Sequence, residues 1–423
     1  MNEELLNFVE ENDVKFVRLA FCDIAGRLKN VSVMAEALEH VLQDGMAFDA
    51  SLVEGFPDAQ GSDLLLQPDP ATMAILPWRP QQGRVARCYC NVLYADGRPF
   101  ESDVRRLLRG TVRKLAELGF AARISLECEF YLFRLDDQGQ PILAPHDQAG
   151  YLDFAPLDRG ENVRREICLS LEQMGIAPMS SHHEAGPGQN EIGLFALSPL
   201  AMADGYISFC NAARTVAARY GLFASFLPKP LKENFGSGLH LSISLYKDGE
   251  NIVKQGDRLS PEAASFLQGI LSTSAELSAF LNPLPGSYER LGCFDAPKEV
   301  AWSYQNRAML ARVPADKGAF ARLELRNPDP SMNPYLCFAL LLEAGLRGIA
   351  QGLELCPENK PCGSLPSSLQ EAVRLAEGSQ LIREVLPKSL LSNYLSLKER
   401  QFRHMYRAED PQAYELSHFF PWA

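Results

Sequence analysis

The stretch Arg123–Phe133, RISLECEFYLF, alternates apolar and polar residues and therefore predicts a β-strand with one buried face and one polar face. Its polar face carries Glu127 and Glu129, which the strand repeat places about 7 Å apart. Two like charges at that distance repel each other unless they lie in water or share a cation. Taken alone, the stretch is typical of a solvated strand face, so its meaning depends on the strands beside it.

Three later segments, NEIGLF, GLHLSISLY and ARLELRNPDP, repeat this division into an apolar face and a polar face. A further glutamate lies seven residues before the glutamate of NEIGLF, across the turn-prone loop AGPGQN. The four polar faces together contribute five glutamates, one histidine and two arginines: Glu127, Glu129, Glu184, Glu191, Glu324, His240, Arg322 and Arg326. If the four strands adjoin in one sheet, these side chains form one acidic cleft.

An acidic cleft of this composition indicates metal-assisted phosphoryl transfer. Five carboxylates need cations, and oxygen ligands with a single imidazole suit Mg²⁺ or Mn²⁺ better than zinc. Arginines among them suit a polyphosphate that such metals bridge. The sequence has no GxxxxGK[ST] loop, no GxGxxG after a strand, no HExxH and no GxSxG. An ATP site must therefore be built from metals and arginines, and the substrate's own carboxylate is an attractive nucleophile for the γ-phosphate.

Charge and hydropathy exclude several other classes of function. The chain of 423 residues has 41 Lys and Arg against 53 Asp and Glu, a formal net charge of -12, which disfavours nonspecific binding to nucleic acid. Its acidic start resembles no signal peptide, and no run reaches the ~18 apolar residues of a membrane span. We expect a cytoplasmic protein that binds neither nucleic acid nor membrane. Most of its 10 scattered cysteines are expected to be reduced thiols.

The pattern changes near residue 100, which predicts a boundary between a domain over 1–100 and another over 101–423. Residues before it read as short strands and turns. The segment after it predicts a helix that Ser102 caps and Gly119 ends. Later long helices are expected to begin at Ser-Pro or Asn-Pro pairs. Because strands do not alternate regularly with helices, we predict an α+β fold with an antiparallel sheet.

Seven segments, in order along nearly the whole chain, resemble the glutamine synthetase family. They are FDASLVEGF, SDLLLQPDPATMAILPW, LECEFYLF, HHEAGPGQNEI, FLPKPLKENFGSGLHLSISL, SYERLGCFDAPKEVAWSYQNRAMLARVP and RLELRNPDPSMNPYLCFALLLEAGLRGI. The resemblance implies a small β-grasp-like N-terminal domain and a larger catalytic domain with a curved antiparallel sheet flanked by helices. It also implies a homo-oligomer of two rings, commonly a dodecamer, with active sites between subunits.

The resemblance further implies two or more Mg²⁺ or Mn²⁺ ions per site, with ATP as co-substrate. Ligands of the first metal are expected to be Glu129, Glu184 and Glu191. Ligands of the second, which bridges the ATP phosphates, are expected to be Glu127, His240 and Glu324. The adjacent pair His182 and His183 matches no motif and is expected to be structural.

The substrate residues are implied in the same way. Four residues are expected to take part in catalysis: Asp49, Asp295, Arg307 and Arg326. The amino acid is expected to be bound by Arg290 and Gly236, together with Arg307 and Arg326. ATP is expected to be bound by Ser244, Arg312 and Arg322. Asp49 is expected to reach in from the neighbouring subunit, where it binds and deprotonates ammonium. The implied reaction forms γ-glutamyl phosphate from ATP and glutamate, and an amine then attacks that intermediate.

Several positions depart from the family pattern without touching the metal ligands. Phe235 replaces the asparagine of Asn-Gly-Ser-Gly, and GCFDAP is one residue shorter than the usual loop, with Asp295 in place of a glutamate. Ser242 replaces a histidine, and Ala196 replaces an aromatic residue. Two alternatives to glutamate–ammonia ligation therefore remain. One is a γ-glutamyl ligase for an organic amine or polyamine, and the other is a catalytically silent relative, which should have lost metal ligands.

The loop CPENKPCGSLPSS, after the helix that begins at NPYL, is shortened and contains no tyrosine. In some bacterial relatives a tyrosine in this loop is adenylylated. We therefore expect no covalent control by adenylylation here.

Overall fold

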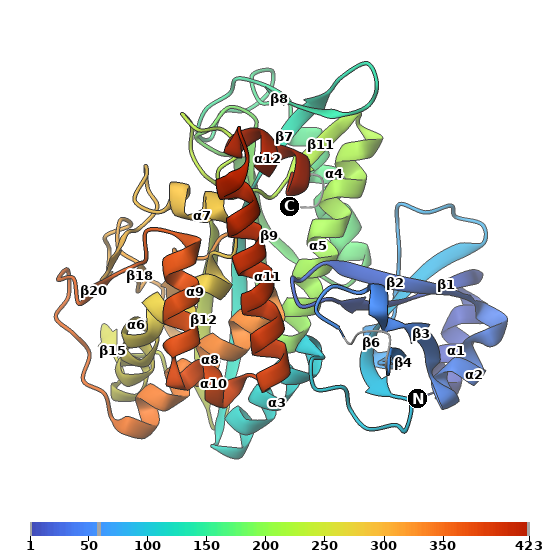
Figure 1. Ribbon diagram of the computed structural model, residues 1–423, viewed down its shortest axis with the longest axis horizontal. Helices are drawn as coiled ribbons and strands as arrows, with labels where there is room; N and C mark the ends of the chain where they lie inside the picture. The colour runs from blue at the N-terminus through green and yellow to red at the C-terminus, as the bar shows by residue number, and fades with distance from the viewer. Residues whose placement is uncertain (1, 57–60, 421–423) are drawn as a thin grey trace.

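The computed structural model describes residues 2–56 and 61–420, which form a small N-terminal sheet region beside a larger region of sheet and long helices (Figure 1). Residues 1, 57–60 and 421–423 fall within the ranges of the two predicted domains but lie outside the described residues. Among the described residues, no helix is long and apolar enough to cross a membrane.

The N-terminal region is a six-stranded sheet in the order β2-β1-β6-β4-β3, with β5 paired to β6. Its strands are β1 (Val14–Cys22), β2 (Leu28–Met34), β3 (Met46–Asp49), β4 (Asp63–Pro68), β5 (Ala74–Ile75) and β6 (Arg84–Tyr94). β1 and β6 run parallel, and the other pairs are antiparallel. The expectation of only strands and turns was wrong here, because the sheet is accompanied by α1 (Asn2–Glu11) and α2 (Leu38–Asp44). Leu5 and Val9, one helical turn apart, give α1 its buried stripe.

The larger region is built on a ten-stranded sheet in the order β17-β18-β19-β12-β7-β10-β9, with β8 and β11 paired to β7 and β13 paired to β12. Its strands are β7 (Phe120–Leu135), β8 (Pro141–Pro145), β9 (Pro178–His183), β10 (Gln189–Leu197), β11 (Leu222–Ser225), β12 (Leu239–Lys247), β13 (Glu250–Asn251), β17 (Trp302–Ser303), β18 (Ala311–Arg312) and β19 (Leu323–Leu325). Only β17 and β18 pair in parallel within the described sheet. Two small antiparallel pairs join β14 (Lys254–Gln255) to β15 (Arg258–Leu259), which form a hairpin, and β16 (Glu299–Val300) to β20 (Gly363–Ser364), which are distant in sequence. The predicted α+β class with an antiparallel sheet is confirmed.

Helices pack against this sheet and against one another. They are α3 (Val104–Glu117), α4 (Glu161–Gln173), α5 (Pro199–Arg219), α6 (Pro261–Leu281), α7 (Pro285–Arg290), α8 (Pro334–Gln351), α9 (Leu369–Gly378), α10 (Gln380–Val385), α11 (Lys388–Arg407) and α12 (Pro411–His418). Four short 3₁₀ turns complete the described elements: Ala35–Ala37, Ala50–Leu52, Pro70–Thr72 and Gly318–Phe320. Helices α6 and α8 cross closely, because a Cβ on Gly348 would lie 2.1 Å from the backbone oxygen of Ser265.

The predicted helix starts are confirmed where Ser or Asn precedes Pro. Asn333 caps α8 by accepting from the backbone amides of Tyr335 and Leu336. The expected cap of α3 was wrong by one residue. Asp103 rather than Ser102 caps it, and its carboxylate also accepts from the amide of Val92 at 3.0 Å. The two oxygens of the carboxylate point to different partners, so one caps the helix while the other binds the amide of Val92.

A buried polar network ties the N-terminal sheet to the helices of the larger region. Arg105 on α3 donates to both carboxylate oxygens of Asp204 on α5, at 3.0 and 2.9 Å, and to Asp69 after β4 at 2.9 Å. Asp204 also accepts from the hydroxyl of Tyr335 on α8 at 2.7 Å, and its backbone oxygen accepts from Tyr89 on β6 at 2.8 Å. One guanidinium therefore neutralises carboxylates from both regions.

Replacing Arg105 with methionine should leave the carboxylate of Asp204 buried without its cation. We expect the free energy of unfolding to fall by about 3–5 kcal/mol, the usual cost of breaking a buried ion pair by removing one partner. Urea denaturation at fixed protein concentration measures this change. The matched control is Arg106→Met at the adjacent exposed position, where a change within about 0.5 kcal/mol is expected. Equal effects of the two substitutions would contradict the assignment.

Candidate active site

The four strands that the sequence grouped by their polar faces do adjoin in one sheet, in the order β19-β12-β7-β10. Their register places polar residues directly opposite one another: His240 with Glu127, Glu191 with Glu129, and Ser242 with Glu324. The alternation of faces along each strand thus gathers these side chains on one side of the sheet.

Above this polar face lies a cleft of about 650 Å³. Twelve of the predicted site residues line it: Glu127, Glu129, Glu184, Glu191, Gly236, His240, Arg290, Asp295, Arg307, Arg312, Arg322 and Arg326. The histidine and the glutamates lie on the strands, except for Glu184, which directly follows β9. The arginines come from the end of α7, the loop after β17, the end of β18 and the two residues that flank β19. The cleft therefore brings an acidic cluster and a basic cluster face to face.

Three predicted residues lie outside this lining. Glu324 is buried behind it, where Arg312 and Arg326 hold its two oxygens at 2.6 and 3.1 Å. Ser244 is buried and donates to the backbone oxygen of Ala321 at 2.9 Å. Asp49 is exposed at the end of β3, far along the chain from the cleft residues, and caps the turn that follows it.

Glu129 and Glu191 are the two carboxyl groups of the cluster whose pKa values are raised by burial. Glu129 accepts from the amide of Gly238 at 2.7 Å and from the side chain of Gln189 at 3.1 Å, yet burial still raises its pKa. Burial, together with the charges of Glu129, Glu127 and Glu184, raises the pKa of Glu191 to about 9. The protein's own groups do not neutralise these carboxylates, so the cluster is built for added positive charge.

Glu127, which lies near the arginines, has a lowered pKa instead. Burial alone would raise the pKa of Glu127, but the hydrogen bond and charge of His240 and the charges of Arg322 and Arg312 outweigh it and lower the pKa to about 2. His240 Nδ1 lies 3.4 Å from Glu127 Oε2, and His240 Nε2 lies 3.8 Å from Glu129 Oε1. The histidine therefore lies between Glu127 and Glu129, which the sequence assigns to different metal ions.

Candidate ligand atoms converge in two groups in the described part of the chain near the cleft. Atoms of Glu127, Glu191 and His240 lie within 4.8 Å of one another, and so do atoms of His182, Glu184 and Glu191. Carboxylate oxygens with an imidazole nitrogen fit a hard divalent cation such as Mg²⁺ or Mn²⁺. Glu191 belongs to both groups, so its carboxylate lies between the Glu127–His240 pair and the His182–Glu184 pair.

Sequence reasoning treated His182 and His183 alike, whereas the structure separates them. His182 lines the cleft opposite Glu191 in the β9–β10 register, with its Nε2 2.9 Å from Glu184 Oε1. His183 is fully buried, as expected of a structural residue, with its Nε2 2.9 Å from Asp147 Oδ1. Strand alternation applied to PMSSHH would have assigned His182 to the cleft face and His183 to the core.

Arg290 forms the floor of the basic side. It is buried and donates to the backbone oxygens of Asn327 and Arg326 at 2.9 and 3.0 Å, and its burial lowers its pKa. The glycine loop passes directly over it. A Cβ on Gly236 would lie 2.8 Å from Arg290 Cγ, and one on Gly238 would lie 2.7 Å from Arg290 Nη2. Only glycine permits this approach, so the loop and the guanidinium fix each other.

An aromatic pair closes the rim of the cleft above the glycine loop. The rings of Phe235 and Phe294 pack with centroids 4.3 Å apart, and the ammonium of Lys229 lies 4.6 Å from the Phe294 ring. Tyr131 holds the backbone of Phe235 by donating to its oxygen at 2.7 Å. Phe235 therefore does line the cleft, and Asp295 follows its partner Phe294 at the exposed rim.

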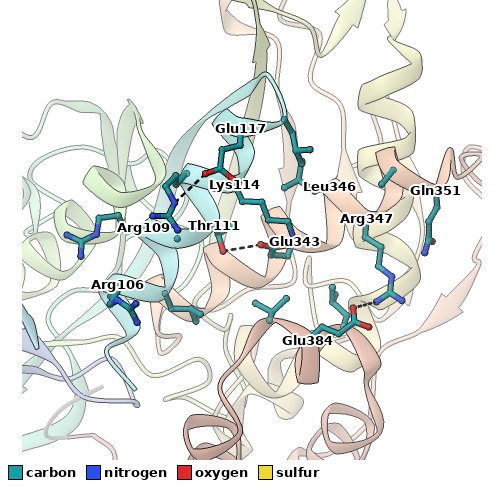
Figure 2. A pocket seen from close by; sticks show the side chains of 17 residues that line it. Arg106, Arg109, Thr111, Lys114, Glu117, Glu343, Leu346, Arg347, Gln351 and Glu384 are labelled. Carbon is teal, nitrogen blue, oxygen red and sulfur yellow. Dashed lines mark hydrogen bonds and ion pairs between the residues drawn. The ribbon is translucent and has the colours of Figure 1, made fainter. Parts of the chain in front are cut away.

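A larger cavity of about 960 Å³ lies elsewhere, between α3, α8 and α10 (Figure 2). Its charges are largely paired with one another: Lys114 binds Glu343, and Arg347 lies 3.5 Å from Glu384. Thr111 adds a hydrogen bond to Glu343 at 3.4 Å. It holds no convergent cluster of carboxylates and imidazoles, so the cleft above the sheet is the candidate active site.

Comparison with known proteins agrees with this assignment. The model of the glutamine synthetase β-grasp domain matches residues 13–95, and that of the glutamine synthetase catalytic domain matches residues 101–417. A glutamine synthetase of Clostridium saccharobutylicum is 43% identical over 418 residues, covering 95% of this chain and 94% of that protein. A glutamine synthetase of Methanosarcina mazei is 40% identical over 435 residues, covering 99% of this chain and 97% of that protein. The chain belongs to the glutamine synthetase family.

Solved structures show the same fold. A GmaS/ADP complex superposes with a TM-score of 0.88 at 27% identity and covers 98% of this chain and 99% of its own. Plasmodium falciparum glutamine synthetase superposes with a TM-score of 0.88 at 22% identity, covering 99% of each chain. The predicted family and the β-grasp-containing α+β fold are confirmed.

Replacing Gly236 with alanine should displace the loop or Arg290, because the new Cβ would lie 2.5 Å from the backbone oxygen of Pro228. A shift of about 1 Å at a substrate-binding group costs on the order of 10²-fold in rate. We expect kcat/KM for the amino-acid substrate to fall by that order, mainly through KM. The matched control is Gly110→Ala, at an exposed position on α3 where nothing lies within 4 Å of the new Cβ. Unchanged kinetics in Gly236→Ala would contradict the tight fit of loop and guanidinium.

Proposed function

We propose that this chain is an ATP-dependent ligase that forms glutamine from glutamate and ammonia through γ-glutamyl phosphate. The observation that carries the proposal is the cleft in which an acidic cluster on four adjoining strands faces five arginines. The predicted enzyme class, an ADP-forming carbon–nitrogen ligase, is confirmed by family membership and by the relatives named glutamine synthetase.

The divalent metals are assigned as the sequence predicts. Glu129, Glu184 and Glu191 would hold the first ion, and Glu127, His240 and Glu324 the second. The raised pKa of Glu191 supports the first assignment, because a cation would neutralise the carboxylates that raise it. His182 adds a ligand atom beside Glu184. When bound, Mg²⁺ or Mn²⁺ supplies charge neutralisation at the γ-phosphate.

Glu324 already has arginine partners in this scheme. Both of its oxygens are held by arginines, Arg312 at 2.6 Å and Arg326 at 3.1 Å. Glu324 would become a stronger metal ligand if an arginine turned toward the phosphates and released one of its oxygens. Arg312 and Arg326 would thereby exchange a protein carboxylate for the negative charge of ATP or of the acyl phosphate.

The remaining roles follow from position in the cleft. Arg290, beneath Gly236, would bind the α-carboxylate of glutamate and orient its side-chain carboxylate for attack. Arg307 and Arg326 would stabilise the charge of the acyl phosphate, with Asp295 at the rim. Arg312 and Arg322 would bind the ATP phosphates. Ser244 is buried on β12, where it holds the backbone of Ala321, the residue before Arg322.

Asp49 would complete the site of a neighbouring subunit rather than its own. It is exposed at the end of β3 and is absent from the lining of this chain's cleft. An exposed carboxylate held by the amide of Ser51 at 2.9 Å is available to a second copy. We propose a homo-oligomer with active sites between subunits, a dodecamer in two rings.

The finer organisation follows the sequence. We propose a domain boundary at residue 100, with domains over 1–100 and 101–423, because the two family models meet between 95 and 101. Cytoplasmic location and the absence of nucleic-acid and membrane partners stay predictions. The silent-relative alternative is not supported, because every predicted metal ligand is retained around one sheet face.

Glu129→Ala tests the metal cluster. The substitution removes a ligand and leaves the γ-phosphate charge less compensated, so we expect kcat/KM to fall by about 10³-fold, or roughly 4 kcal/mol of transition-state stabilisation. Phosphate release at saturating Mg²⁺ or Mn²⁺ measures it. The matched control is Glu117→Ala, an exposed position on α3, which should leave the rate unchanged. Near-native ligase activity of Glu129→Ala would refute the assignment.

The acceptor is tested by comparing kcat/KM for ammonium, methylamine, ethylamine and putrescine at one pH. Relatives at 38–43% identity named glutamine synthetase favour ammonia over an organic amine. We expect ammonium to be preferred by several orders of magnitude. If methylamine or putrescine equals or exceeds ammonium, the organic-amine alternative replaces the proposed function.

A further inference from the structure

Two cysteine thiols touch each other in the loop that follows α8. Cys356 Sγ lies 3.2 Å from Cys362 Sγ, with Cys362 exposed and Cys356 partly buried. Both are reduced in the structure, as all ten cysteines are. Cys356 and Cys362 lie in the first part of the shortened loop CPENKPCGSLPSS, and the ligase chemistry proposed above uses neither thiol.

Backbone contacts hold both ends of the loop, so the proximity of the sulfurs is built in. The amide of Cys356 donates to the side chain of Gln268 at 2.8 Å, and Trp302 Nε1 donates to the oxygen of Cys356 at 2.7 Å. The amide of Cys362 donates to the oxygen of Val300 at 2.8 Å. A disulfide needs the sulfurs at about 2.05 Å, a closure of about 1 Å that side-chain rotation can supply.

We propose that Cys356 and Cys362 form a reversible intramolecular disulfide when the protein meets a hydroperoxide. The thiolate of Cys362 attacks the peroxide oxygen, which breaks the O–O bond and gives a sulfenic acid and water after proton uptake. The sulfur of Cys356 then attacks the sulfenic sulfur, forms the S–S bond and releases a second water. Two thiols and one hydroperoxide thus give one disulfide and two waters, or water and an alcohol for an alkyl peroxide.

The environments of the two sulfurs fit this order of events. Cys362 is exposed and meets the oxidant first, while its thiol also donates to the oxygen of Val300 at 3.3 Å. Burial and the Cys362 thiol raise the pKa of Cys356 to about 12, so Cys356 stays a thiol while Cys362 is oxidised. It gives up its proton only as it attacks the sulfenic sulfur beside it, and that proton leaves with the hydroxyl group as water. A small dithiol reverses the bond by thiol–disulfide exchange.

The disulfide would stiffen a loop that braces the approach to the active site. Glu358, between the two cysteines, accepts from the hydroxyl of Ser303 and the amide of Tyr304, both at 3.0 Å. The amide of Asn359 donates to the oxygen of Trp302 at 2.9 Å. From Tyr304 the chain runs directly to Arg307, which lines the cleft.

Peptide mapping of the full-length protein tests the bond. The reduced protein is treated with one equivalent of hydrogen peroxide, and its remaining free thiols are alkylated. It is then digested without reductant by a protease that cleaves after glutamate. Cleavage after Glu358 separates LCPE (355–358) from residues 359–371. We expect these two peptides to run as one disulfide-linked species that dithiothreitol separates. Separate peptides, with Cys362 oxidised or untouched, would overturn the proposal, as would a link between two chains.

Two variants and one further measurement sharpen the test. Cys356→Ser should give no disulfide-linked peptides and should leave Cys362 as a sulfenic acid that a dimedone-type probe traps. Cys168→Ser, at a partly buried cysteine on α4, is the control and should still give the disulfide-linked peptides. Amide hydrogen exchange over 356–362 should be slower in the oxidised protein than in the reduced protein. Equal exchange rates would show that the bond does not brace the loop and would overturn that part of the inference.

Discussion

The concentration of carboxylates on one face of the central sheet is the constraint on which the site depends. Glu129 and Glu191 face each other across the β7–β10 pair, and both lose hydration through burial. Neutral donors such as the amide of Gly238 reduce this cost without removing it. Positive charge must come from His240, from the arginines across the cleft, and from added cations. The geometry of the glycine loop and of Arg290 therefore follows from the need to compensate buried charge.

Such a charged face is stable only because the opposite face of the same strands is firmly packed. Along β7, residues alternate between the cleft and an apolar layer in which the Phe130 ring stacks on Phe226 and meets Phe209 of α5 edge-on. The long helices α6 and α8 add a second layer, brought close by Gly269 and Gly348. The polar network of Arg105 and Asp204 then fastens the N-terminal sheet to these helices. Apolar burial on one face thus holds the polar face at fixed geometry.

Strand periodicity predicted which residues share one face of the long alternating strands, and the strand register confirms that placement for Glu127, Glu129 and His240. The family was predicted from seven matching segments rather than from periodicity. Periodicity failed where a residue's role depends on partners distant in sequence. Nothing local shows that Asp103 serves Val92 as well as α3, or that Glu324 is held by two arginines. His182 was missed although the same alternation was available, because histidine pairs in short strands carry little pattern of their own.

The shortened GCFDAP loop, with Asp295 in place of a glutamate, is one of the departures that left an organic amine open as the acceptor. The structure shows what occupies that region. Phe294, immediately before Asp295, lies against Phe235, and Lys229 approaches the far side of the pair. The replacement of asparagine by Phe235 and the shortening of the loop therefore meet in one contact between two rings at the rim of the cleft, and become a matched pair of changes. Rings that pack on each other occupy space at this rim, which is the physical reason that a shorter loop need not leave an open pocket.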